Sequence, residues 1–123
     1  MERTDFEKLV EDAIRDVPEW FLEKLENIVV VVEDEPTPET NRRMGIGKGS
    51  TLLGLYEGVP LNRRGFYYGN VLPDKITLYR GPILRQGGDR EEVAARVRST
   101  VIHEIGHFFG LSDEELRKLE RGG

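Results

Sequence analysis

Apolar residues near the beginning of the chain recur at the spacing of an α-helix. Between residues 4 and 17 they stand three or four positions apart and therefore gather on one helical face: Phe6, Leu9, Val10, Ala13, Ile14 and Val17. Thr4 or Asp5 is a suitable N-cap for this helix. Pro18 suits the first turn of a second, short helix over residues 18–27, because a backbone N–H at that position has no helical partner to lose.

Three later segments concentrate β-forming residues between turn residues and predict strands. The first, NIVVVVED at residues 27–34, is a run of β-branched residues typical of a buried strand. LLGLYEG at residues 52–58 and KITLYRG at residues 75–81 predict two more. Residues 35–50 are rich in proline, glycine and charge, and we expect a mobile loop there. A second loop, residues 59–74, is rich in glycine and arginine.

The helical period returns between residues 89 and 109, and at 1.5 Å per residue this helix is about 30 Å long. The segment before it, PILRQGG, predicts a turn or a single helical turn. Gly110 stands in the position where glycine commonly ends a helix. Ser112 and Glu115 then occupy the positions of a capping box at the start of a short last helix.

Composition narrows the class of protein. A chain of 123 residues suits one domain with a single core, over residues 1–123. The net charge of -5, with arginine and glutamate interleaved, provides no basic stripe for a nucleic acid backbone. We expect a cytoplasmic protein with no membrane segment, because the start lacks the apolar region of a signal peptide and no long apolar run follows. A charged fraction of 33% without cysteine also suits a protein from a hot environment.

The segment VIHEIGHFFG holds both histidines of the chain, His103 and His107. Because the chain has no cysteine, any metal must be held by histidine and carboxylate groups. Two imidazoles one helical turn apart can converge on one Zn²⁺, which takes nitrogen ligands at about 2.0 to 2.1 Å. Glu104 lies beside them, where it can act as a base for a zinc-bound water. The alternative is that these histidines and the glutamate are ordinary residues of a helix without a metal. Because an HExxH motif rarely arises by chance in so short a chain, we favour a metal site.

A third ligand must come from outside this helix. Gly110 allows the chain to turn back, and Asp113 stands ten residues after His103 in the pattern HExxHxxGxxD. Its carboxylate would leave the fourth position of the zinc ion open to water, as in catalytic sites. Asp113 and its acidic neighbours also suit the first turn of the last helix, and Glu114 is the second candidate for the ligand.

HEIGHFFGLSDEEL, together with LLGLYEGVPL and VLPDKITLYRGPIL, resembles the small bacterial zincin-like metallopeptidases, also called minimal zincins. The resemblance covers most of residues 50–120. It implies a compact single-domain α+β fold, in which a small mixed β-sheet packs against the helix that carries HExxH. It also implies metal ligation by His103, His107 and Asp113, with Glu104 as the general base. Asp113 stands where metzincins have a third histidine, and too few residues follow it for a Met-turn.

These observations predict a zinc-dependent metallopeptidase that hydrolyses a peptide or protein substrate through a zinc-bound water. Candidate donors to the oxyanion are Tyr67, Tyr68 and Tyr79. KITLYR is a possible edge for an extended peptide. The alternative is a non-catalytic zincin-fold module that binds metal and a peptide or protein partner. A purely structural zinc is disfavoured, because structural sites usually have four protein ligands and the sequence offers three.

Overall fold

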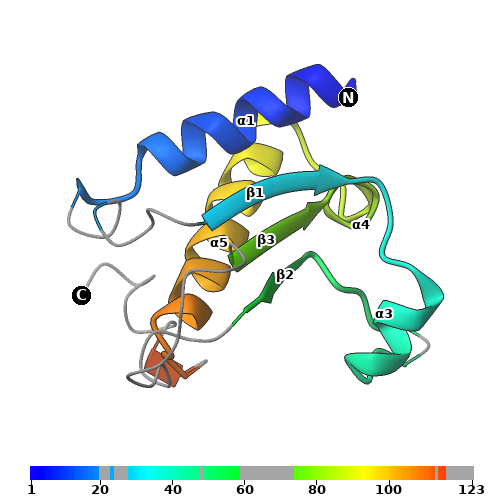
Figure 1. The fold of residues 1–123 in the computed structure, drawn as a ribbon. Coiled ribbons are helices and arrows are strands. Elements are labelled where there is room, and N and C mark those ends of the chain that lie inside the picture. The colour runs from blue at the N-terminus through cyan, green and yellow to red at the C-terminus, as the bar shows by residue number, and fades with distance from the viewer. Residues whose placement is uncertain (20–22, 24–27, 48, 59–73, 113, 116–123) are drawn as a thin grey trace.

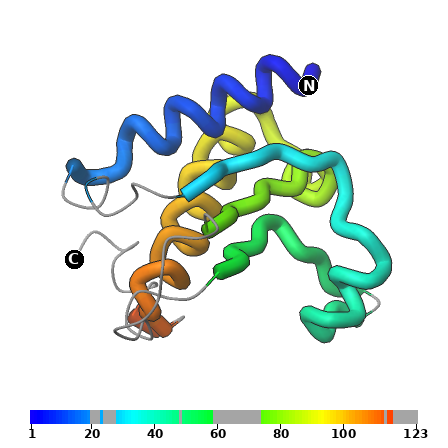
Figure 2. The backbone as a smooth tube through the Cα atoms, viewed as in Figure 1, coloured from blue at the N-terminus to red at the C-terminus, as the bar shows by residue number. Residues whose placement is uncertain are grey.

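A computed structural model describes residues 1–19, 23, 28–47, 49–58, 74–112 and 114–115 of the chain. A three-stranded sheet lies on the long helix α5 (Arg90–Phe108), and α1 (Arg3–Arg15) packs against α5. Figure 1 shows α1 running beside β1 (Ile28–Glu33), with α5 crossing behind the strands. In Figure 2 the backbone brings α1 and α5 together, although these helices are far apart in the sequence. The predicted second helix over residues 18–27 falls mainly outside the described residues.

The sheet has the order β1-β3-β2, with β3 (Asp74–Tyr79) in the centre. β1 runs parallel to β3, and β2 (Gly54–Glu57) runs antiparallel to it. This mixed sheet on the histidine-bearing helix confirms the predicted α+β class. The suggestion that KITLYR offers an edge is wrong, because β3 is paired on both sides. Among the described strands, the edges belong to β1 and β2.

β1 is only half buried, so the prediction of a buried strand is wrong. Ile28, Val30 and Val32 belong to or pack against the core, whereas Val29 is 42% exposed. The alternation has a simple cause: successive side chains of a strand point to opposite faces, and the helices α1 and α5 cover only one of them. Four consecutive valines conceal this alternation in the sequence.

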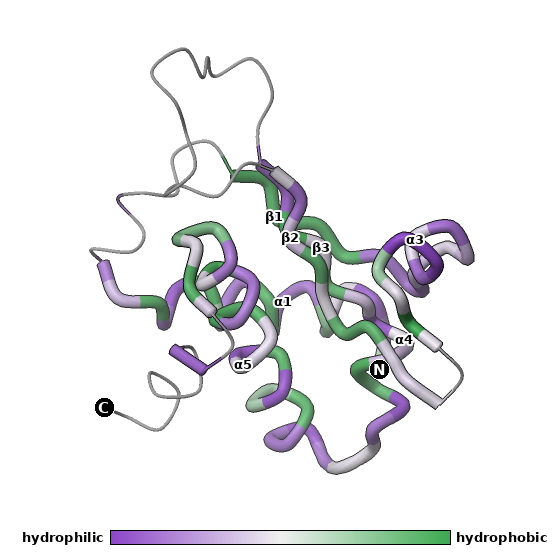
Figure 3. Tube along the Cα trace, turned by 90° about the horizontal axis from the view of Figure 1, so that it is seen from below, coloured by the Kyte–Doolittle hydropathy of each residue, from purple (hydrophilic) through white to green (hydrophobic). Residues whose placement is uncertain are grey.

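The core lies between the two helices and the inner face of the sheet. Its fully buried members come from α1, β3, α4 (Arg80–Arg85) and α5: Phe6, Ile76, Leu78, Ile83, Val97 and Val101. In Figure 3 β1 is largely green, which marks hydrophobic residues, whereas β2 and β3 mix green with white and purple. Burial of an aliphatic or aromatic side chain contributes about 1.5 to 3 kcal/mol, so this cluster determines how α5 sits on the sheet.

Helix α1 buries the predicted face but begins earlier than predicted. Its N-cap is Glu2, which makes no side-chain capping bond, so the assignment of Thr4 or Asp5 as N-cap is wrong. The tertiary contacts of Arg3 explain the early start. Its guanidinium donates to the backbone carbonyl of Val32 in β1 and pairs with Asp34. These bonds hold the first turn of α1 against the end of β1.

The prediction of a loop over residues 35–50 is wrong for its middle part, where α3 (Pro38–Arg43) forms. Thr37 is the N-cap, and its side chain accepts a hydrogen bond from the backbone N–H of Thr40 at 3.0 Å. Thr-Pro is a helix-start signal that the high content of proline and glycine concealed. The helix buries no residue and is mostly purple in Figure 3. Arg43 at its end pairs with Glu57 of β2 at 3.3 Å.

Two ion pairs join α4 to the residues that follow β1. Arg85 donates two hydrogen bonds to the carboxylate of Glu35, at 2.6 and 2.8 Å, and this contact lowers the pKa of Glu35. Arg80 pairs with Asp34 at 3.0 Å. Both bonds join α4 to the end of β1, and the first four residues of the predicted turn PILRQGG belong to this helix.

No helix in the described parts of the chain is long and apolar enough to cross a membrane.

Helix α5 begins at a complete capping box. The side chain of Asp89 accepts from the backbone N–H of Glu92 at 2.9 Å, and the side chain of Glu92 accepts from the N–H of Asp89. We expect Asp89→Ala to lower the free energy of unfolding by about 1 kcal/mol, because it leaves a helical N–H without its partner. Asp89→Asn is the matched control, since asparagine caps equally well. Urea unfolding measures both variants, and equal losses would contradict the capping role.

Candidate metal centre

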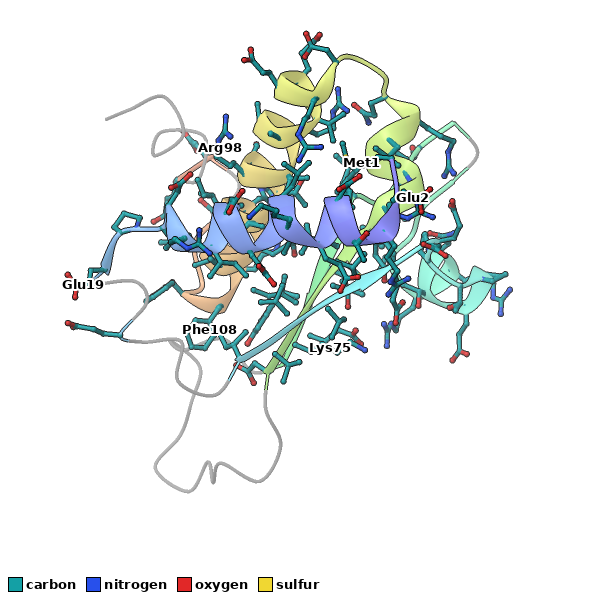
Figure 4. All side chains as sticks on the ribbon, turned by 90° about the horizontal axis from the view of Figure 1, so that it is seen from above. Met1, Glu2, Glu19, Lys75, Arg98 and Phe108 are labelled. Carbon is teal, nitrogen blue, oxygen red and sulfur yellow. The ribbon has the colours of Figure 1, made fainter. Side chains whose placement is uncertain are left out.

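The last two turns of α5 bring His103, Glu104 and His107 together. One candidate ligand atom from each lies within 4.8 Å of the others. The two imidazole rings have their centroids 4.6 Å apart, with an angle of 73° between the ring planes. Phe108, labelled in Figure 4, marks the end of the helix directly after His107. Three of the four residues that the sequence proposed for the site therefore lie within one turn of helix.

Packing of α5 determines the direction in which this group faces. Val97, Val101, Ile105 and Phe108 are buried along the helix and prevent it from rotating about its axis. The two histidines, at the border of this apolar face, are therefore only partly buried. A position that is neither inside the core nor fully in water suits a metal site, because the ion needs both rigid ligands and access for a substrate.

Glu104 is the most deeply buried member of the group, with 5% of its surface exposed. One of its carboxylate oxygens, Oε1, lies 3.3 Å from Nδ1 of His107. A buried carboxylate needs polar or charged partners, because loss of hydration is costly. A glutamate on an ordinary helix face stays exposed to water. Glu104 is instead buried between α5 and β2, and this burial indicates a specific role for its carboxylate.

A cavity of about 320 Å³ opens beside the group. It lies between the start of β2 and α5, and His103 and Glu104 form part of its wall. The other lining side chains are apolar or carry a hydroxyl group: Leu52, Leu53, Ser99 and Thr100. The sequence alone did not single out these residues or Gly54, which also lines the cavity. The signal available was the glycine itself, since a glycine inside a strand often marks a close approach.

The chain turns sharply after the histidines. Gly110 has a φ of 77°, in the left-handed region that favours glycine, as the prediction of a helix-ending glycine requires. Its N–H donates to the carbonyl of His107 at 3.0 Å, and the N–H of Leu111 donates to the carbonyl of Gly106 at 2.9 Å. These two bonds form a Schellman motif. The segment that follows His107 is therefore turned away from the helix axis.

The predicted capping box follows this turn. The N–H of Ser112 donates to the side chain of Glu115 at 3.2 Å, and the N–H of Glu115 donates to the hydroxyl of Ser112 at 3.1 Å. This reciprocal pair is confirmed. Asp113, the predicted third ligand, lies outside the described residues. Glu114, the second candidate, is exposed and does not belong to the group around the histidines.

Tyr79 does not line the cavity. Its neighbour Leu78 belongs to the core, so the alternation of the strand directs Tyr79 to the other face of the sheet. Burial raises the pKa of its hydroxyl, and the charge of Glu33 adds to the shift. A raised pKa favours the protonated hydroxyl, and Tyr79 is not among the residues that line the cavity beside His103 and Glu104. Tyr67 and Tyr68 lie outside the described residues.

Comparison with known proteins agrees with this geometry. A family model described as zincin-like metallopeptidase matches residues 25–123. The chain belongs to the zincin-like metallopeptidase family. This member resembles a solved structure of a conserved hypothetical protein from Thermo thermophilus, at 29% identity and a TM-score of 0.58, over 99% of this chain and 100% of that one. No match was found among curated proteins. Membership of this family makes the protein a candidate zinc peptidase.

The paired histidines of this zincin-like protein predict binding of one Zn²⁺ per chain. Titration of chelator-treated protein, followed by calorimetry, measures it. His107→Ala should weaken binding by more than about 100-fold, because loss of a direct ligand costs more than loss of a residue that only supports one. Arg98→Ala, an exposed change on the same helix, is the control. Equal zinc affinity in the His107→Ala variant and the wild type would refute the assignment.

Proposed function

We propose that this protein is a zinc-dependent peptidase that hydrolyses peptide bonds with Glu104 as the general base. One observation carries the proposal: two histidines stand one helical turn apart with a buried carboxylate 3.3 Å from the second, and the first histidine and the carboxylate line a cavity. Family membership supports it independently. The remaining elements of the proposal follow from what each side chain can do in this place.

The donor set fits Zn²⁺. His103 and His107 offer nitrogen atoms from a rigid helix, and these atoms lie close enough to share one small ion. Asp113 is our proposed third ligand, since it follows the turn at Gly110 that leads the chain away from the helix. When bound, zinc supplies Lewis acidity that polarises a carbonyl group and lowers the pKa of a water molecule.

Glu104 is proposed to move the proton. Its carboxylate takes a proton from the attacking water as the water oxygen forms a bond to the carbonyl carbon of the peptide. The same proton then passes to the amide nitrogen when the carbon–nitrogen bond breaks, so the carboxylate is regenerated. Burial of Glu104 supports this role, because a charge with little surrounding water interacts more strongly with the groups that face it.

The edge strand β2 offers a way to hold an extended peptide. Of its two sides, only one is occupied by a described strand, β3. β2 also packs against α5, and its first residue approaches Glu104. A peptide added to this edge would form backbone hydrogen bonds that do not depend on its sequence. We therefore assign the peptide-binding edge to β2 in place of KITLYR.

Asp113 is tested by comparison with its neighbour. Asp113→Ala should weaken zinc binding by more than about 100-fold if its carboxylate is a direct ligand, since even supporting residues cost about 10 to 100-fold. Glu114→Ala should change zinc affinity little, because Glu114 is exposed and stands apart from the histidines. Calorimetric titration of both variants measures the difference. The reverse order of the two losses would transfer the ligand role to Glu114.

Glu104→Gln tests the chemical step. Glutamine has nearly the same shape but cannot accept a proton from water, so zinc binding should persist while peptide hydrolysis falls by about 10² to 10⁴-fold. The assay uses a mixed peptide library at neutral pH with added zinc, read by mass spectrometry. Equal cleavage by Glu104→Gln and the wild type would exclude the mechanism. Tight zinc binding without cleavage by the wild type would favour the non-catalytic peptide-binding module.

A further inference from the structure

Gly54, the first residue of β2, lies against α5 where a side chain does not fit. A Cβ placed on this glycine would lie 2.7 Å from Cγ2 of Thr100 and 3.2 Å from Cγ of Glu104. It would also lie 3.2 Å from the backbone carbonyl oxygen of Thr77. The first distance is well inside van der Waals contact. Strand and helix therefore approach each other here as closely as a glycine allows.

Backbone conformation does not explain the glycine. Gly110 and several glycines in the turns have a positive φ, whereas Gly54 does not. Any residue could adopt the extended backbone of Gly54, so its special property is the missing side chain. The close approach has one consequence for the site: a Cβ at position 54 would press on the side chain of Glu104, which stands beside the two histidines.

β2 cannot withdraw to make room. Gly54 is paired with Leu78 of the central strand, and the carbonyl of Leu53 accepts a hydrogen bond from the N–H of Tyr79 at 2.9 Å. Leu78 is itself fully buried. A side chain at position 54 would therefore have to displace groups on α5, because movement of the strand would break the sheet.

We propose that Gly54 is a positioning residue for Glu104. Its bare backbone forms one wall for the stem of the glutamate and holds the carboxylate on the side of the histidines. This inference rests on the proposed function, because it gives Glu104 a reason to be positioned. It adds that β2, the strand proposed to hold the peptide, also determines where the base stands. The contact between β2 and α5 at Gly54 would then determine how far the carboxylate of Glu104 lies from the backbone of a peptide bound to β2.

Two variants test this inference: Gly54→Ala alone, and the double variant that combines Gly54→Ala with Thr100→Ser. The serine removes Cγ2, the atom in the closest contact, and keeps the hydroxyl that donates to the carbonyl of Arg96 at 2.8 Å. The double variant therefore relieves the contact with Thr100 but retains the contacts with Cγ of Glu104 and with the carbonyl oxygen of Thr77. Gly47→Ala is the matched control, because no described heavy atom lies within 4 Å of a Cβ at that position and its φ is not positive.

The first measurement does not need a substrate. Carbon-13 labelling of glutamate follows the Glu104 carboxylate by NMR in the metal-free protein, with the resonance assigned from its loss in Glu104→Gln. Thermal unfolding follows stability in the same samples. We expect the double variant to unfold near the temperature of Thr100→Ser and to show a shifted Glu104 resonance, while Gly47→Ala shows no shift. If the Glu104 resonance is unshifted in both Gly54→Ala and the double variant, the proposal is overturned.

Kinetics provide the second measurement once a cleaved peptide is known. The double variant should lose about 10-fold in kcat with KM nearly unchanged, since displacement of a catalytic group by about 1 Å can cost about 10²-fold and the shift here is smaller. Zinc affinity should equal that of Thr100→Ser. Full recovery of kcat in the double variant would also refute the positioning role. If zinc-loaded wild type cleaves no peptide, the proposed function fails, whereas the NMR result still decides the role of Gly54.

Discussion

The burial of one face of α5 is the interaction on which the rest of this structure depends. Val97 and Val101 are fully buried against the sheet and α1, and Ile105 continues the same line toward the end of the helix. Apolar burial has no preferred direction, but a row of interlocked side chains along a helix leaves it one orientation. That orientation brings His103, Glu104 and His107 to the border of the core.

The same packing links the sheet to the chemistry. β2 is short, yet it contacts α5 directly because its first residue has no side chain. A larger residue there would press on the side chains of Thr100 and Glu104 and displace them. The cavity, the edge strand and the carboxylate therefore form one unit, and the central strand β3 supports this unit from behind.

Charged groups have a separate role where β1 ends and α4 begins. Arg3, Arg80 and Asp34 join α1 and α4 to the end of β1, and Arg85 holds Glu35 in the same region. These pairs are largely exposed, so each contributes little to stability on its own. Their value is geometric, because they anchor the chain before it leaves the sheet toward α3. The metal centre lies away from this cluster, on the last turns of α5.

Local patterns in the sequence determined the elements and the candidate metal ligands. The helical period of α5, the HExxH spacing and the capping box at Ser112 depend only on residues a few positions apart, so they could be found without the fold. Strand order, the exposed side of β1 and the early start of α1 could not, because each depends on partners far away in the sequence, such as Asp34 for Arg3. The importance of Gly54 belongs to the same class. A glycine in a strand pattern shows only that a side chain is absent, and the tertiary structure alone shows that Thr100 and Glu104 lie against the place of that side chain.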